Sequence, residues 1–520
     1  MIGGQSKGQR VRRSVVAGGL ALAIVALAPV ASVAMSASAP SPIVDPEFVR
    51  TIGGPGAGMG QFANVVDVAV DSQGRIIATD AVREKVLIFN STGVFLDEIG
   101  EPGSAAGQLN MPFGVAVAPN DDIYVADRGN HRIQVFNSSG NHVRAWGSEG
   151  TGNTQFTQPS GIAIDSQNRV IVTDFEADRV QIFHLNGTFI TKFGASGANP
   201  GQLNGPFGVS TGPDDEIVVA ELLNDRVQVF DSSAGFLAEI GEPGSGAGAL
   251  NNPIGVVVDS AGNVFAVDRG DDQINVFTLD GEFLGSFGSS GTGDGQFQTL
   301  NLLGLDRAED VLVADVGRND VQLFDFHRCF GLLATIVGTD GPDNLVGTAG
   351  EDVISGLGGN DTISGGGSRD WLCGGSGKDT IDGNGGSDRI DGLSGGDVLD
   401  GGSGNDRVLG GSGGDELFGK AGSDDLFGGA DADELFGGGG KDLLVGGKQG
   451  DLLDGEDGDD VLRGGSGGDV LKGRADDDEL RGQSGGDDLQ GGSGVDECIG
   501  GKGSDTASAC ETRKGIPYWL

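Results

Sequence analysis

The stretch Gly401-Gly402-Ser403-Gly404-Asn405-Asp406-Arg407-Val408 belongs to a nine-residue unit that repeats through residues 338–510. Asp recurs at every ninth position from Asp343 to Asp505, nineteen times without a slip. Gly precedes each of these Asp residues by five positions, and Leu, Ile or Val follows seventeen of them by two positions. Ordinary loops tolerate insertions but stacked coils do not, so this strict spacing indicates a stack.

Each unit predicts one turn followed by one very short strand. Gly at fixed positions permits positive φ and close backbone approach. The apolar residue is the middle one of the next three, so it points inward from a short strand. Two units close one coil, and nineteen units give about nine coils in a rod roughly 45 Å long. A disordered Gly- and Asp-rich linker would not need an apolar residue at a fixed phase.

Stacking places equivalent carboxylates above one another. Two such charges about 5 Å apart repel by roughly 3–4 kcal/mol at an effective dielectric constant near 20. A column of them therefore requires a cation. Carboxylate and carbonyl oxygens are hard ligands, which select Ca²⁺ among the abundant cations. The pattern predicts several bound calcium ions.

These residues resemble the hemolysin-type (RTX) calcium-binding nonapeptide, Gly-Gly-x-Gly-x-Asp-x-Leu-x, over about a third of the chain. The resemblance implies a parallel β-roll in which Asp carboxylates and turn carbonyls of adjacent coils share each Ca²⁺. Ser368, Asp431, Gln449 and Asp476 replace the Gly two positions before the Asp, so sites beside them are expected to be weak or empty. The resemblance implies that the following residues bind Ca²⁺ through their carboxylates: Asp352, Asp361, Asp370, Asp379, Asp388, Asp397, Asp406, Asp415, Asp424, Asp433, Asp442, Asp451, Asp460, Asp469, Asp478 and Asp487.

The charge of the chain is concentrated in this array. The formal net charge is −43, and residues 338–510 hold 31 Asp and 6 Glu against 6 Lys and 6 Arg, a net charge of −25. So acidic a chain repels nucleic acid and anionic membranes, which excludes a polynucleotide partner.

Four cysteines allow three disulfide pairings. The pairs Cys329–Cys373 and Cys498–Cys510 are favoured because they would clamp the two ends of the array. Free, buried thiols are the alternative. No catalytic thiol or zinc site is indicated near them.

Residues 1–34 are interpreted as an export signal. Basic residues from Lys7 to Arg13 precede an apolar run from Val15 to Leu27, and small residues lead to cleavage after Ala34 or Ala39. An uncleaved anchor is the alternative, because the run approaches the length that spans a bilayer. Residues 35–46 are rich in Ala, Ser and Pro and are expected to form a tether.

A second period, of 47 residues, fills residues 47–326. Each period is expected to contain four short alternating strands, such as 114–118, 123–126, 132–136 and 142–146. Six such units predict a six-bladed β-propeller, closed by residues 48–53 as the fourth strand of the last blade. The fold class is therefore all-β: a six-bladed propeller, a linker and cap strand at 327–337, a parallel β-roll at 338–510 and a tail at 511–520. An acidic residue also recurs once in each 47-residue unit, at Asp80, Asp127, Asp174, Glu221, Asp268 and Asp315.

The units resemble the NHL repeat at Pro112-Phe113-Gly114-Val115-Ala116-Val117 and at residues 127–136. The resemblance implies binding of an extracellular protein, peptide or glycan. The repeated acids are interpreted as turn carboxylates that hold neighbouring loops. Asp67 breaks the Gly pattern on the first inner strand, either as a cation or ligand site or as a neutral substitution. No histidine falls on an expected inner strand, so a zinc site is not expected.

We expect a secreted or cell-surface bacterial protein whose roll folds on Ca²⁺ and whose propeller binds a partner. The alternative is a propeller enzyme, a lyase or hydrolase, with the array as an accessory or secretion domain. No catalytic residue is assigned, because no nucleophile elbow or Ser/His/Asp constellation is visible. No membrane span is expected once the signal is removed.

Overall fold

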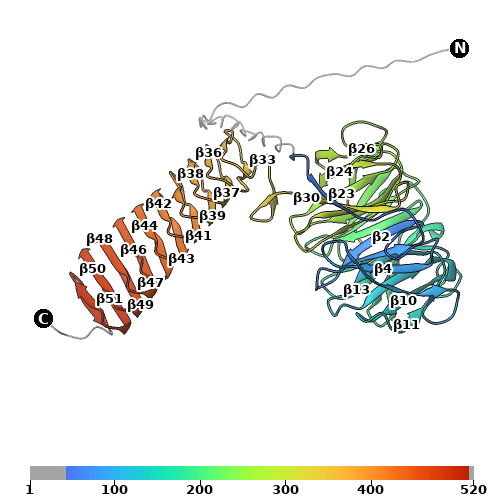
Figure 1. Cartoon of the computed structure of the whole chain (residues 1–520), viewed down its shortest axis with the longest axis horizontal. Coiled ribbons are helices and arrows are strands. Elements are labelled where there is room, and N and C mark those ends of the chain that lie inside the picture. The colour runs from blue at the N-terminus through green and yellow to red at the C-terminus, as the bar shows by residue number, and fades with distance from the viewer. Residues whose placement is uncertain (1–42, 515–520) are drawn as a thin grey trace, which may run out of the picture. The chain divides into compact units, whose positions relative to one another are not determined.

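The computed structural model describes residues 43–514 and shows the predicted all-β architecture, a six-bladed propeller and a parallel β-solenoid (Figure 1). The expected export signal and residues 35–42 of the expected tether lie outside the described residues. Between residues 43 and 514, no helix has the length and apolar character needed to cross a bilayer.

The propeller consists of six four-stranded antiparallel sheets. Short parallel pairs lie between some blades, namely β6 with β7 (Glu101–Pro102, Gln108–Leu109), β20 with β21 (Glu242–Pro243, Ala249–Leu250) and β26 with β27 (Ser289–Ser290, Gln296–Phe297). The blades are β2–β5 (Val65–Val70, Ile76–Asp80, Lys85–Phe89, Phe95–Ile99), β8–β11 (Pro112–Val117, Ile123–Asp127, Arg132–Phe136, His142–Trp146), β12–β15 (Pro159–Ile164, Arg169–Asp174, Arg179–His184, Phe189–Phe193), β16–β19 (Pro206–Thr211, Ile217–Glu221, Arg226–Phe230, Phe236–Ile240), β22–β25 (Pro253–Val258, Asn263–Asp268, Gln273–Thr278, Phe283–Phe287) and β28–β30 (Leu300–Leu305, Val311–Asp315, Asp320–Asp325) with β1 (Glu47–Gly53).

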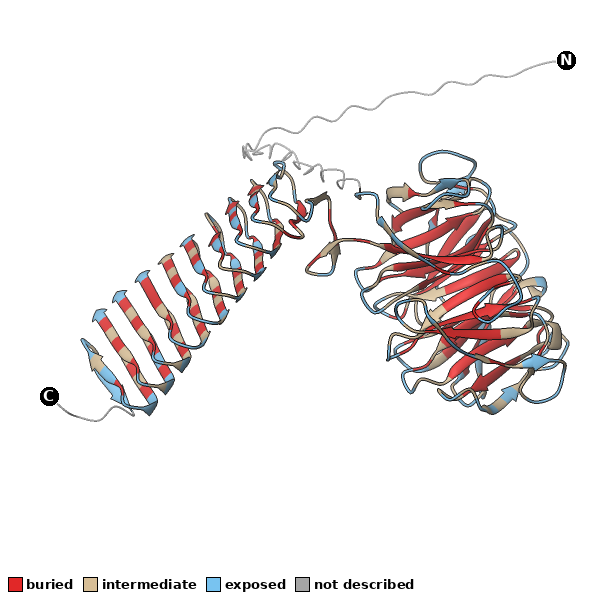
Figure 2. Ribbon diagram, in the orientation of Figure 1, coloured by how far each residue is buried: buried red, intermediate tan, exposed pale blue. Residues whose placement is uncertain are grey.

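The first strand closes the ring, as the sequence predicts. β1 pairs antiparallel with β30, and Ile52 lies opposite Val321. The last blade is thus built from both ends of the propeller segment, which covers a sheet edge that would otherwise be open. The second and third strands of the blades are almost entirely buried, so the core runs between the sheets (Figure 2).

The six periodic acids hold loops, as interpreted from the sequence. Each side chain is fully buried and accepts a hydrogen bond from the backbone N–H seventeen residues earlier. Asp127 also accepts hydrogen bonds from Arg132 and Gln134. A buried carboxylate with this many donors is a structural anchor, because its desolvation is offset by hydrogen bonds.

The segment after the propeller begins with a two-stranded hairpin, β31–β32 (Arg328–Cys329, Leu332–Leu333).

The expected tether precedes the propeller in the chain. Its residue Ile43 packs on the propeller, and the Ile43 N–H donates to the Leu284 carbonyl oxygen at 3.2 Å. The described residues of the tether, from Ile43 onward, are therefore part of the propeller surface.

The solenoid has two parallel sheets in which residues pair with those eighteen positions later, as Leu417 does with Leu435, except at the last strand, where Glu497 pairs with Thr512. It has about ten turns, one more than the sequence estimate, because β33 and β53 add a strand at each end. One sheet contains β33 (Ile336–Val337), β35 (Val353–Ser355), β37 (Trp371–Ser376), β39 (Arg389–Ser394), β41 (Arg407–Ser412), β43 (Asp425–Ala430), β45 (Leu443–Lys448), β47 (Val461–Gly467), β49 (Glu479–Gly485), β51 (Glu497–Gly503) and β53 (Thr512–Lys514). The other contains β34 (Asn344–Val346), β36 (Thr362–Gly366), β38 (Thr380–Asn384), β40 (Val398–Asp400), β42 (Glu416–Ala421), β44 (Glu434–Gly439), β46 (Leu452–Asp457), β48 (Val470–Ala475), β50 (Asp488–Ser493) and β52 (Thr506–Ser508).

The solenoid core is a ladder one side chain deep. The apolar residue of each unit from Ile354 to Leu489, and Cys498 after it, is at most 1% exposed. Full burial of a Leu or Ile side chain stabilises the fold by about 1.5–3 kcal/mol. Two disulfides lie at the ends of the ladder, Cys329–Cys373 and Cys498–Cys510, with Cα–Cα distances of 5.7 and 6.0 Å. These are the two pairs that the sequence analysis favours.

Candidate calcium-binding array

The periodic Asp side chains form two columns along the solenoid. Each Asp ends a turn and directly precedes a strand, so each sheet has one column beside it. The backbone N–H of each Asp from Asp343 to Asp487 donates to Oδ1 of the Asp eighteen residues later, at 2.8–3.2 Å. Neighbouring coils are therefore joined through one oxygen of every carboxylate from Asp361 onward. This bond also fixes the direction of the second oxygen.

The second oxygen, Oδ2, is buried without a hydrogen-bond donor in the same seventeen residues. A buried carboxylate oxygen without a partner costs several kcal/mol, and native proteins rarely tolerate it. Seventeen repetitions cannot be an accident of packing. The oxygens belong to Asp361, Asp370, Asp379, Asp388, Asp397, Asp406, Asp415, Asp424, Asp433, Asp442, Asp451, Asp460, Asp469, Asp478, Asp487, Asp496 and Asp505.

In many repeats, a Gly lies between an orphaned Oδ2 and a backbone carbonyl oxygen of the next coil. A Cβ added to Gly410 would lie 2.5 Å from Asp415 Oδ2 and 2.7 Å from the carbonyl oxygen of Gly428. Gly437 is flanked in the same way by Asp442 Oδ2 at 2.6 Å and the Gly455 carbonyl oxygen at 2.7 Å. At these positions, a side chain would occupy the space between the carboxylate oxygen and the carbonyl oxygen, so Gly is required there.

This donor set fits Ca²⁺, which takes six to eight oxygen ligands at about 2.3–2.6 Å. Among the described residues, no three His, Cys, Asp or Glu side chains gather into a metal-binding cluster. Turn carbonyl oxygens would supply the other ligands, such as that of Gly428, which flanks Gly410 together with Asp415 Oδ2. A bound calcium ion would supply the positive charge that the buried carboxylates lack.

Burial raises the pKa values of the periodic carboxyl groups from Asp361 to Asp496. Asp388, Asp397, Asp424, Asp433, Asp460 and Asp478 have pKa values of about 7, and Asp370, Asp406, Asp415, Asp451 and Asp469 have pKa values of about 6, against an ordinary value of 3.8. Desolvation is the largest cause in every case, and the hydrogen bond from the preceding coil lowers the pKa. Without a cation, the six groups with pKa values of about 7 are partly protonated at neutral pH.

The structure places all sixteen sequence-predicted ligands in the two columns, but Asp352 differs from the rest. Its Oδ2 accepts hydrogen bonds from the backbone N–H and the hydroxyl of Thr348. Conversely, Asp496 and Asp505 have orphaned Oδ2 atoms and were not among the predicted ligands. Their signal was visible, since both keep the ninefold phase and the Gly five positions earlier.

The four residues that replace Gly two positions before an Asp fall into turns. Asp431, Gln449 and Asp476 adopt positive φ values of 80°, 66° and 71°. Gln449 Nε2 donates to Asp431 Oδ1 at 2.5 Å, so these two side chains satisfy each other on the surface. The local backbone strain indicates that the coil geometry is imposed by its neighbours.

The regular coils, the Asp columns and the turn glycines coincide with a known repeat. The RTX calcium-binding nonapeptide repeat (4 copies) matches residues 337–372, 373–408, 409–444, 436–471 and 472–507. Residues 337–507 are RTX calcium-binding repeats. RTX repeats imply calcium binding and are typical of secreted bacterial proteins. The NHL repeat matches residues 109–136 and 156–183, in the second and third blades.

Solved structures similar to the propeller include several enzymes. A streptogramin B lyase is 14% identical, covering 53% of this chain and 96% of its own, with a TM-score of 0.41. A virginiamycin B lyase from Staphylococcus aureus is 18% identical (52% and 82% coverage, TM-score 0.38), and a gluconolactonase from Xanthomonas campestris is 14% identical (54% and 99%, 0.40). No curated protein matches the chain. Similarity this low assigns no activity.

The propeller channel contains a cavity of about 230 Å³ lined by the inner strands of all six blades. The lining includes Asp67 but none of the four histidines. His131 Nδ1 instead contacts the carbonyl oxygen of Thr157 at 2.7 Å, in a turn.

In excess chelator, the RTX roll of the full-length chain is expected to stay folded at pH 5 and to be unfolded at pH 8. The folded state has carboxyl pKa values of about 6–7 against 3.8 ordinarily, so it binds more protons than the unfolded state between these values. The resulting stabilisation is complete below about pH 4 and is lost as the pH rises through 6 to 7. Circular dichroism at both pH values measures this. A roll that is as folded at pH 8 as at pH 5 in chelator would contradict the prediction.

Proposed function

We propose that this chain is a secreted calcium-binding protein in which the RTX roll folds on Ca²⁺ and the propeller binds an extracellular protein, peptide or glycan. The observation that supports calcium-dependent folding of the roll is the two columns of Asp side chains, in which seventeen Oδ2 atoms are buried without a hydrogen-bond donor. Calcium is plentiful outside cells, and extracellular modules bind it at about 10⁻⁴–10⁻³ M. The roll would therefore become ordered after export.

Support for partner binding comes from one end of the propeller. Val82, Met111 and Leu223 are 67%, 47% and 56% exposed on loops. All three loops lie where the inner strands begin, because Val65 pairs with Asp80, Pro112 with Asp127 and Pro206 with Glu221. Large exposed apolar side chains on loops at one end of a fold are typical of interaction surfaces. We call these three side chains the loop face.

The same end of the propeller carries a cationic side chain, Arg128, directly after Asp127. The guanidinium of Arg128 lies 4.2 Å from the ring centroid of Phe113 and within 5.6 Å of those of Phe175 and Phe207. Arginine and aromatic side chains are enriched at the centres of protein interfaces. The combination suits a peptide or glycan that offers apolar surface and hydrogen-bond acceptors.

The triple variant Val82→Ser, Met111→Ser and Leu223→Ser is expected to weaken partner retention at least tenfold. The experiment immobilises the calcium-loaded full-length chain and quantifies, by mass spectrometry, species retained from cell-surface and culture material. The matched control is Val94→Ser, Leu96→Ser and Leu237→Ser, whose side chains are 58%, 51% and 54% exposed on or beside fourth strands. Equal retention by both variants, or no specific retention by the parent chain, would reject the loop face.

A further inference from the structure

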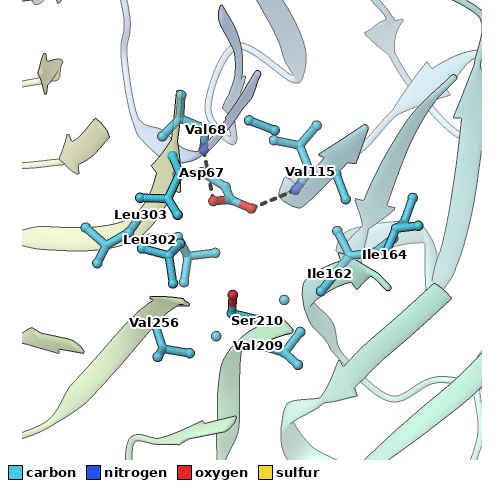
Figure 3. A pocket seen from close by; sticks show the side chains of 18 of the residues that line it. Asp67, Val68, Val115, Ile162, Ile164, Val209, Ser210, Val256, Leu302 and Leu303 are labelled. Carbon is cyan, nitrogen blue, oxygen red and sulfur yellow. Dashed lines mark hydrogen bonds between the residues drawn. The ribbon is translucent and has the colours of Figure 1, made fainter. Parts of the chain in front are cut away.

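The central channel of the propeller holds an acidic side chain that the calcium array and the loop face do not use. Its cavity extends to the ends of the inner strands at Val70, Val117 and Ile164, away from the end where the loop face lies. Valine, isoleucine and leucine side chains form most of the wall, as Figure 3 shows. The polar side chains in the lining are those of Asp67, Ser210 and Thr211, and Asp67 is the one titratable group.

Asp67 lies on β2, the inner strand of the first blade, and its side chain contacts the second blade. Its Oδ1 accepts the backbone N–H of Val68 at 2.9 Å and its Oδ2 that of Val115 at 2.7 Å. Figure 3 shows the carboxylate at the edge of the lumen, with Ser210 on the opposite wall. Each oxygen accepts one hydrogen bond, so each retains a lone pair for a further donor.

The fold does not require a carboxylate at this position. The equivalent residues of the next four blades are Gly114, Gly161, Gly208 and Gly255. A Cβ there would approach a carbonyl oxygen of the adjacent inner strand, to 2.7 Å for Gly208 and Gly255. Glycine is thus the residue of four blades, and the other two carry Asp67 in the first blade and Leu302 in the sixth.

The carboxylate of Asp67 is costly in an empty channel. The Asp67 residue is 5% exposed, and burial raises its pKa to about 8, although both backbone N–H groups lower it. No basic side chain lines the cavity to compensate the charge. A buried acid without a counter-ion, in a concave apolar site, marks a binding position.

We propose that the channel binds a small organic cation, a primary or secondary ammonium on an apolar body, with the Asp67 carboxylate as its counter-ion. The ammonium would donate to the free lone pairs of Asp67, and the apolar body would contact the walls of Val209, Val256 and Leu303. The cavity is smaller than the roughly 300–1,000 Å³ of drug-sized sites, so the ligand is small. This site is independent of the loop face and of calcium.

The test compares three probes of one shape on the calcium-loaded full-length chain at pH 8.5: cyclohexylammonium, cyclohexanol and cyclohexanecarboxylate. Isothermal titration calorimetry is expected to show cyclohexylammonium binding at least about tenfold more tightly than cyclohexanol, and no binding of the carboxylate, because only the cation pairs with a buried anion. Equal binding of the cation and the alcohol, or no binding of cyclohexylammonium at millimolar concentration, would overturn the proposal.

Variants separate this role from a structural one. Asp67→Asn keeps the side-chain shape, and Asp67→Gly restores the residue of four other blades; both are expected to lose at least about tenfold in affinity for cyclohexylammonium. Asp121→Asn makes the same charge change outside the cavity lining, where Asp121 accepts a hydrogen bond from Ser72, and it is expected to keep the parent affinity. If Asp67 is only a link between blades, its variants lower the melting temperature without changing the affinity, which would also reject the proposal.

Discussion

Removal of calcium at pH 7.5 is expected to unfold residues 338–514 and to leave the propeller folded. The roll buries seventeen carboxylate oxygens without donors, and its core is a ladder of single side chains. Deprotonation of these groups leaves like charges about one strand spacing apart, each pair repelling by roughly 3–4 kcal/mol. Metal binding and folding are then one event. The propeller has separate cores between its sheets, so it does not depend on the roll.

Limited proteolysis followed by mass spectrometry measures this on the full-length chain. In excess chelator, cleavage within residues 338–514 should accelerate at least about a hundredfold, while residues 47–326 stay protected. Readdition of Ca²⁺ should restore protection, and Mg²⁺ should not, because it demands octahedral geometry at shorter distances. Asp433→Asn should raise the calcium concentration needed, whereas Asp425→Asn, at a half-exposed outward position, should not. A roll that resists protease in chelator at pH 7.5 would contradict the prediction.

Gly413→Val is expected to prevent folding of the central coils even in saturating calcium. Gly413 has a φ of 122°, where side chains are strained, and a Cβ would overlap the carbonyl oxygen of Gly395 in the coil before it. The overlapping atom is backbone held by the hydrogen bonds of the stack, so it cannot move without breaking coil pairing. We expect a loss of at least about 4–5 kcal/mol, the range of the most disruptive point substitutions.

Gly439→Ala is the matched control. Gly439 lies in β44 without positive φ, and the nearest atom to an added Cβ is the Lys420 carbonyl oxygen at 3.9 Å. Its melting temperature in calcium should stay within a few degrees of the parent chain. Circular dichroism and proteolysis of both variants decide the matter, and a Gly413→Val chain with the parent melting temperature would refute the stacking argument.

Local patterns were enough to predict most of the fold. The ninefold phase of Asp and Leu determines an eighteen-residue coil, and the pairing of Leu417 with Leu435 follows from it. The 47-residue period likewise predicted six blades, and the match of residues 48–53 to other fourth strands predicted the closure by β1. These features repeat, so a single unit carries the information for all of them.

Individual sites were harder, because they depend on neighbours that differ from unit to unit. Asp352 was predicted as an ordinary ligand, yet Thr348 supplies donors to its Oδ2. Asp67 left two interpretations open, since its partner Val115 belongs to another blade, forty-eight residues later. The cap strand predicted within 327–337 is present as β33, whereas the strand β53 at the other end lies in the tail, which lacks the repeat.

The sequence by itself determined the two repeat architectures, the position of every periodic Asp and the need for cations beside them. A strict period determines geometry because each coil or blade contacts copies of itself. Only the tertiary structure decided which oxygen of each Asp is bonded and which is orphaned, and that Asp67 faces an apolar lumen without a counter-ion. These depend on hydrogen bonds between segments that are distant in sequence, and no local pattern records the direction of a carboxylate.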